Sequence, residues 1–172
     1  MKRPAAATVF GILNIVFAVF GVFGVIGSAM MFAVAGDASK NPVLQIIRDN
    51  PAYAAWMKLS IPLGLATSAA LLAAGIGLLH LKPWARVLSI VYAVYAIVMV
   101  ITGTVVNYLF LLQPLMQQAR GKSGPEAAAA IGGAIGGTVG GCFGVLYPAA
   151  LLIFMLLPKV SAAFKPNPAD GQ

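Results

Sequence analysis

Residues 131–144 read Ile-Gly-Gly-Ala-Ile-Gly-Gly-Thr-Val-Gly-Gly-Cys-Phe-Gly, so glycine recurs at every fourth position in two neighbouring rows. Residues four apart on an α-helix lie almost above one another, and the two rows therefore form one helix face without side chains. Such a face lets a second backbone approach closely, which is how helices associate in lipid. We name this face the glycine ladder. It comprises Gly132, Gly136, Gly140 and Gly144 in one row and Gly133, Gly137 and Gly141 in the other.

The composition is typical of a chain that lies in a membrane. Hydrophobic residues make up 60% of the 172 residues and charged residues only 9%, whereas about a quarter of a soluble domain is charged. The basic residues occur in small groups that flank the apolar runs, a pattern expected at lipid headgroups and not on a nucleic-acid-binding surface. We therefore expect the lipid bilayer, and no nucleic acid, as a partner.

Four apolar runs are each long enough to cross the hydrocarbon core, which takes about 20 helical residues. The sequence thus predicts an all-α membrane protein. Its expected fold is a four-transmembrane-helix up-down bundle that forms a single domain, with short amphipathic helices in the outer loops. The expected spans cover residues 5–35, 59–81, 87–112 and 126–157.

The first apolar run also has features of a secretory signal peptide, because it follows Lys2 and Arg3 and ends in an Ala-x-Ala site at residues 33–35. Residues 5–35 are, however, much longer than the apolar core of a signal peptide, which has about 7–15 residues. We therefore interpret this run as a span, and cleavage after Ala35 is the less favoured alternative.

Small and polar residues indicate where the first two spans pack. In the first span we expect Asn14 to bond to a neighbouring helix, because an unpaired amide is costly in lipid. It shares one side of the helix with Ala18, Gly21 and Ser28. In the second span small residues recur four apart, with Ala66, Ala70 and Ala74 in one row and Ala69, Ala73 and Gly77 in the other.

Both outer loops contain an Asn-Pro or Gln-Pro pair followed by an amphipathic stretch, at residues 41–48 and 113–120. The first pair predicts the start of a short helix, and Asn50-Pro51 predicts a second cap that opens the next helix. The likeness of the two loops suggests an internal repeat of residues 1–81 and 82–172. Chance similarity in an apolar chain is the alternative.

A tight hairpin, Lys82-Pro83-Trp84-Ala85-Arg86, is expected between the second and third spans. Its cations predict a cytoplasmic turn, which places both termini of a four-span chain in the cytoplasm. The same Lys-Pro-Trp-Ala-Arg turn resembles one found in small predicted four-span bacterial membrane proteins of unknown function. The resemblance covers the second and third spans at most, and it implies a bacterial cytoplasmic membrane and no activity. The expected interface anchors are Trp56, Lys82, Trp84 and Arg86.

No catalytic, cofactor-binding or metal-binding constellation is recognisable in the sequence. Asp, Glu, Lys and Arg are absent from the interiors of the expected spans, where transport and proton relays rely on charged groups. His80, the one histidine, falls at the hairpin, and Cys142, the one cysteine, falls among the ladder glycines. We do not expect these two residues to form a nucleophile–base pair. The chain is therefore expected not to be an enzyme and to need no cofactor or metal.

The glycine ladder is therefore the main functional feature. Each glycine lowers the stability of a water-exposed helix by roughly 1 kcal/mol relative to alanine. A pattern of glycines as regular as this one therefore indicates a use. The favoured use is packing of the fourth span within the chain. The alternatives are a contact between the chains of a homo-oligomer and a groove that admits an apolar ligand. Pro148 cannot donate a hydrogen bond to the Gly144 carbonyl, so we expect a kink or hinge there.

Two functions follow as hypotheses. The leading one is a non-enzymatic membrane protein of assembly or interaction, with a protein partner that the sequence does not specify. The second is an oligomeric pore or small-solute channel, in which glycine-faced helices lie at the contacts between protomers.

Overall fold

The computed structural model describes residues 5–33, 42–119, 132, 136 and 144–164, and all regular structure within them is helical. Three helices are long and apolar enough to cross a membrane, which confirms the predicted fold at this coarser level and is compatible with a multi-pass membrane protein. A shorter apolar helix spans Gly144–Leu156. The expected fourth span, residues 126–157, lies mostly outside the described residues, so the four-span bundle stays a prediction.

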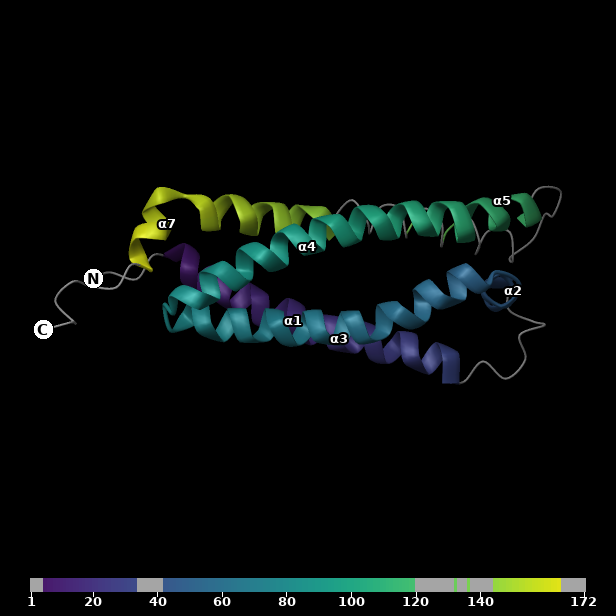
Figure 1. Ribbon diagram of the computed structural model, residues 1–172, viewed down its shortest axis with the longest axis horizontal. Coiled ribbons are helices and arrows are strands. Elements are labelled where there is room, and N and C mark those ends of the chain that lie inside the picture. The colour runs from purple at the N-terminus through teal and green to yellow at the C-terminus, as the bar shows by residue number, and fades with distance from the viewer. Residues whose placement is uncertain (1–4, 34–41, 120–131, 133–135, 137–143, 165–172) are drawn as a thin grey trace, which may run out of the picture.

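The long helices are α1 (Ala5–Ala33), α3 (Pro51–Leu79) and the continuous run of α4 (Pro83–Asn107), the π-helix η2 (Tyr108–Leu112) and α5 (Gln113–Ala119). Figure 1 shows α1 and α3 side by side, and α4 leaving α3 at a tight turn. We name this end of the molecule the hairpin end. Helix Gly144–Leu156 runs into α7 (Pro158–Ala163) there. The opposite end, the loop end, carries α2 (Pro42–Asp49) and α5.

The helices α1 and α3 are in backbone contact at two glycines. A Cβ atom on Gly75 would lie 2.8 Å from the Gly11 carbonyl oxygen, and one on Gly11 would lie 3.1 Å from the Gly75 carbonyl oxygen. Both distances are shorter than an ordinary van der Waals contact, so a side chain at either position would push the helices apart. Asn14 and Ala18 are buried on the same side of α1, which confirms the packing side predicted for this helix.

The predicted rows of α3 are buried only in part. Ala74 and Gly77 are buried, and the exposed members are Ala66, Ala69 and Ala73. The α3 residues that touch α1 closely lie on another face: Gly64, Ser68 and Gly75. Together with the buried Leu71 they are spaced by four, three and four residues, the heptad spacing of helices that wind around each other. At 3.6 residues per turn, the two predicted rows lie on a different side of α3 from this seam. The predicted rows therefore do not coincide with the contact.

The predicted turn between α3 and α4 is confirmed. The Lys82 N–H donates to the Gly77 carbonyl at 2.9 Å and the Leu81 N–H to the Leu78 carbonyl at 3.0 Å, which are the two bonds of a Schellman cap. Leu81 takes the left-handed conformation, with φ of 52°, that glycine usually supplies at this position. Pro83 then begins α4, where its fixed φ favours the first helical position.

A second packed cluster closes the loop end. The short helix α2 buries Ile46 and Ile47, which confirms that it is amphipathic. Asn50 caps α3 as predicted, because its side chain accepts the Tyr53 N–H at 3.1 Å. The Tyr53 O–H donates to Oδ1 of Asn107 at 2.7 Å. This bond ties the beginning of α3 to the end of α4.

The third long helix contains a π-helical turn because of Pro114. Proline has no N–H, and its ring clashes with the carbonyl four residues back, here that of Phe110. The backbone widens to pass the ring, and the Gln113 N–H donates to the Tyr108 carbonyl five residues back. The helix thus continues beyond residue 112, where the expected third span ends.

Gly75→Ala is expected to lower the free energy of unfolding by about 1–3 kcal/mol, because its methyl group would meet the Gly11 carbonyl and the two backbones would have to separate. Thermal unfolding in detergent micelles, followed by circular dichroism, measures the change. Gly24→Ala is the matched control, because no described atom lies within 4 Å of a Cβ there. Equal losses of stability in the two variants would contradict the proposed importance of the contact.

Candidate functional site

Three ladder glycines lie among the described residues. Gly132 and Gly136 are exposed, and no described atom lies within 4 Å of the position that a Cβ would take on either. Gly144 is exposed as well, and its Cβ position is 3.7 Å from the methyl groups of Val100 on α4, an ordinary contact distance. The other ladder glycines lie outside the described residues: Gly133, Gly137, Gly140 and Gly141.

These ladder positions differ from the glycines that pack between helices of the chain. A Cβ on Gly11, Gly75 or Gly77 would collide with atoms of a neighbouring helix. A side chain at Gly132 or Gly136 would displace no described part of the chain. Packing within the described residues therefore does not account for glycine at these two positions.

Pro148, the expected hinge, is buried in helix Gly144–Leu156. Its burial shows that this turn of the helix faces the bundle. Residues 137–143, which would form the other arm of a kink, lie outside the described residues, so the kink stays a prediction.

A side-chain hydrogen bond joins α1 to helix Gly144–Leu156. The Tyr147 O–H donates to Oδ1 of Asn14, which is fully buried. This confirms the predicted bond from Asn14 to a neighbouring helix. The rings of Phe10 and Phe17 flank Tyr147, with centroids 6.4 and 4.2 Å from its ring. In such apolar surroundings water cannot replace either partner of this hydrogen bond. The bond therefore helps to specify which faces of the two helices meet.

A second contact holds the same helix at the hairpin end. Pro158 has no N–H, so the hydrogen-bonding pattern of helix Gly144–Leu156 cannot continue through it. The Phe154 carbonyl accepts the Leu157 N–H at 3.3 Å, and the Met155 carbonyl needs a donor from elsewhere. Arg86 of α4 supplies one, because its Nε–H donates to the Met155 carbonyl at 3.0 Å. The guanidinium charge also lies at the negative end of the helix dipole, where a cation is stabilising.

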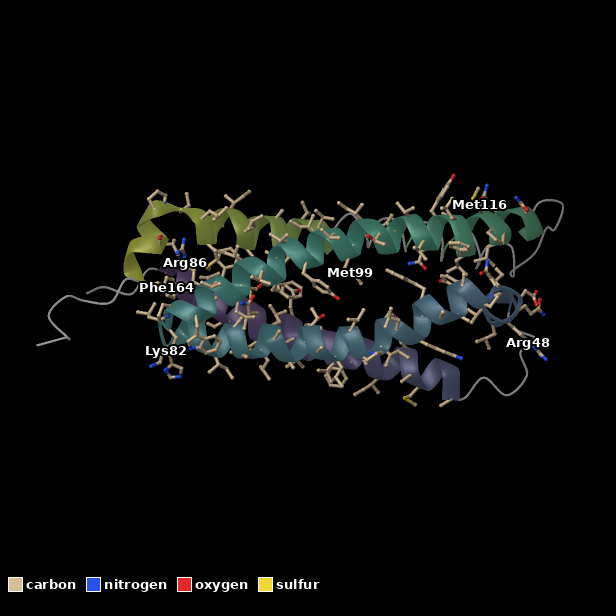
Figure 2. The ribbon with its side chains drawn as sticks, in the orientation of Figure 1. Arg48, Lys82, Arg86, Met99, Met116 and Phe164 are labelled. Carbon is tan, nitrogen blue, oxygen red and sulfur yellow. The ribbon has the colours of Figure 1, made fainter. Side chains whose placement is uncertain are left out.

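One apolar cluster unites the elements that meet at the hairpin end. After Pro158 the chain turns into α7, and Figure 2 shows Phe164 and Arg86 at this end of the molecule. The cluster draws on residues near the beginning and the end of the described chain: Ala7, Phe10, Leu78, Ala85, Ala93, Leu151, Met155, Val160 and Phe164. The buried residues of α4 lie in its first three turns: Ala85, Ser89 and Ala93. The described part of the bundle is thus packed most thoroughly at the hairpin end.

Three of the four predicted interface anchors lie at the hairpin end. Lys82 and Trp84 are exposed there and Arg86 is half-buried. The indole of Trp84 lies over α3, since a Cβ on Gly77 would come within 2.9 Å of it. Trp56, the fourth anchor, is half-buried towards the loop end of α3.

The described residues offer little chemistry beyond these contacts. No three His, Cys, Asp or Glu side chains among them come together as a metal site. His80 is exposed at the turn, and Cys142 lies outside the described residues.

Sequence reasoning missed the contact between Gly11 and Gly75. A signal was present, because Gly11 precedes Asn14 by three residues and so continues the heptad seam of Asn14, Ala18 and Gly21. On α3 the small residues were grouped in rows four apart, and Gly75 belongs to neither row. The partners of Asn14 and Arg86 were also missed. No local signal marks Tyr147 or Met155, because the choice of neighbouring helices depends on tertiary packing.

The chain matches no known protein family, no curated protein and no solved structure. The resemblance of its Lys-Pro-Trp-Ala-Arg turn to a turn of small bacterial membrane proteins gains no support from these comparisons. Any function must therefore be argued from the residues themselves.

Tyr147→Phe is expected to lower the free energy of unfolding by about 1–3 kcal/mol, because it leaves the buried Asn14 amide without its hydrogen bond. In an Asn14→Leu background the same change should have little effect, since no amide is left unpaired. A double-mutant cycle of equilibrium unfolding in mixed micelles measures the coupling. Equal effects of Tyr147→Phe in the two backgrounds would argue against the bond.

Proposed function

We propose that the chain is a multi-pass integral membrane protein without enzymatic activity, whose role is assembly or interaction, and that its copies associate through the glycine ladder into a homo-oligomer. The observation that carries this proposal is the open space at Gly132 and Gly136. A lipid-facing helix gains nothing from missing side chains, whereas two helices that meet at glycines gain close van der Waals contact. The open space therefore favours a contact between chains over the packing of the ladder within one chain.

The proposed topology has four spans, with both termini and the hairpin end in the cytoplasm of a bacterium. The apolar helix Gly144–Leu156 supports a fourth span across residues 126–157, because it belongs to the same apolar stretch and bonds to α1 through Tyr147. Lys82 and Arg86 support the orientation, since cations are enriched in cytoplasmic turns.

The wild-type protein is expected to be an oligomer in nanodiscs or mild detergent, and Gly136→Leu is expected to reduce it to a folded monomer. Leucine would fill the open space that a partner backbone would otherwise enter. The mass of the purified protein in lipid or detergent measures the oligomeric state.

Gly24→Leu is the matched control for this experiment. Gly24 is also exposed and without a described atom within 4 Å of its Cβ position, but it belongs to α1 and not to the ladder. This variant should keep the mass of the wild type. A wild-type monomer, or an oligomer that survives Gly136→Leu, would rule out assembly through the ladder.

A second candidate function is an oligomeric pore or small-solute channel. It is favoured by Thr104, a polar residue of α4 whose side chain is exposed. Its hydroxyl donates to the Val100 carbonyl at 2.7 Å, and its oxygen can still accept a hydrogen bond. In a homo-oligomer such side chains would offer hydrogen bonds to a polar solute along a pore. The expected result is flux of ions or small solutes in proteoliposomes, lowered by Thr104→Val. Liposomes that stay tight at high protein density would exclude a pore.

A further inference from the structure

We propose that Arg86 binds the phosphate group of an anionic membrane phospholipid at the hairpin end. This inference needs only that the protein lies in a membrane, and it is independent of assembly through the glycine ladder. The lipid would be a second partner of Arg86, in addition to the Met155 carbonyl.

Within the part of the chain that the structure describes, the guanidinium of Arg86 has donors left over after its hydrogen bond to Met155. Arginine carries five N–H groups in a planar fork. One of them, on Nε, is used by the Met155 carbonyl at 3.0 Å. Within the described residues no carboxylate forms an ion pair with this side chain, and no second hydrogen bond is made by it. The bond at Nε restricts the side chain, and its Nη groups remain for a planar or tetrahedral oxyanion.

Among the described residues, the charges at the hairpin end are unbalanced. Arg86 is half-buried, and Lys82 is exposed in the adjoining turn. The one acidic residue among the described residues, Asp49, belongs to α2 at the opposite, loop end (Figure 1). A partly buried cation without a counter-ion is costly, and an anion supplied from outside the chain offsets that cost.

The position of Arg86 matches the depth of lipid phosphates. Trp84, two residues earlier, is 51% exposed although its indole lies over Gly77. Exposed tryptophans at the ends of apolar helices lie at the level of the headgroups. Arg86 lies less than one turn further along α4, so its Nη groups can reach the phosphate layer from just inside it.

A bound phosphate would also stabilise the end of the bundle. The same guanidinium holds the Met155 carbonyl, where the chain breaks before α7. Helix α7 is followed by Phe164, which is buried in the hairpin-end cluster together with Val160 of α7. A lipid that fixes Arg86 therefore stabilises the packing of α7 against the hairpin-end cluster. A lysine at this position could supply the positive charge. It could not donate one hydrogen bond to the Met155 carbonyl and also make a bidentate contact with a phosphate.

The test compares lipid binding and thermal unfolding of the full chain in nanodiscs of phosphatidylcholine with and without phosphatidylglycerol. Native mass spectrometry of protein released from the same nanodiscs counts retained lipids. The wild type is expected to retain phosphatidylglycerol and to melt at a higher temperature in its presence. Arg86→Gln is expected to weaken the binding about tenfold, the effect of one charge-assisted contact, and to abolish the rise in melting temperature.

Lys82→Gln is the matched control, because it removes one charge from the same end at an exposed side chain. It should keep most of the binding and of the thermal shift. Equal losses in Lys82→Gln and Arg86→Gln would overturn the site in favour of a diffuse attraction to the membrane surface. A shift produced by inorganic phosphate in phosphatidylcholine alone would overturn the assignment to a lipid.

Arg86→Lys covers the case in which Arg86→Gln does not fold. It keeps the charge, so it should fold and still bind less phosphatidylglycerol than the wild type, and full binding by this variant would count against the site. Failure of the protein to enter nanodiscs would instead refute membrane insertion. A wild type that inserts but shows no preference for phosphatidylglycerol would refute the lipid site alone.

Discussion

The backbone contact between Gly11 of α1 and Gly75 of α3 is the constraint on which the rest of the bundle depends. It brings two long helices to a separation that no side chain at either position would permit. The heptad seam that continues from it along both helices keeps them together over several turns. Next to this contact lies Asn14, whose amide is thereby buried and directed at a third helix. The remaining elements attach to the pair that this contact creates.

Two polar contacts then fix helix Gly144–Leu156. Tyr147 bonds to Asn14 within the bundle, and Arg86 bonds to the Met155 carbonyl at the hairpin end. Apolar side chains in lipid distinguish poorly between alternative neighbours, since the solvent is as apolar as they are. Hydrogen bonds that water cannot replace are more selective, so two of them at different heights define both the rotation and the axial position of this helix.

The features that could be predicted from the sequence are those set by short stretches of chain. The Asn50 cap, the amphipathic α2 and the turn before Pro83 each follow from residue types within a few positions of one another. The packing side was predicted correctly on α1. On α3 the predicted rows contain the buried Ala74 and Gly77 but not the glycines that meet α1. The π-helical turn at Pro114 was missed because a proline in a long helix can kink it, end it or widen it. The partners of Asn14 and Arg86 could not be predicted, as they depend on which helices become neighbours.

The hairpin-end cluster has a consequence for the order in which the protein can form. It combines Ala7 and Phe10 with Val160 and Phe164, which are synthesised much later. The α1–α3 pair and the hairpin can assemble while synthesis continues, but this core stays incomplete until Phe164 has been made. Contacts between such distant parts of a chain form slowly, because a long loop must close first. Completion of this core therefore follows the pairing of α1 with α3, and a chain truncated before Val160 leaves the N-terminal turns of α1 without two of their partners, Val160 and Phe164.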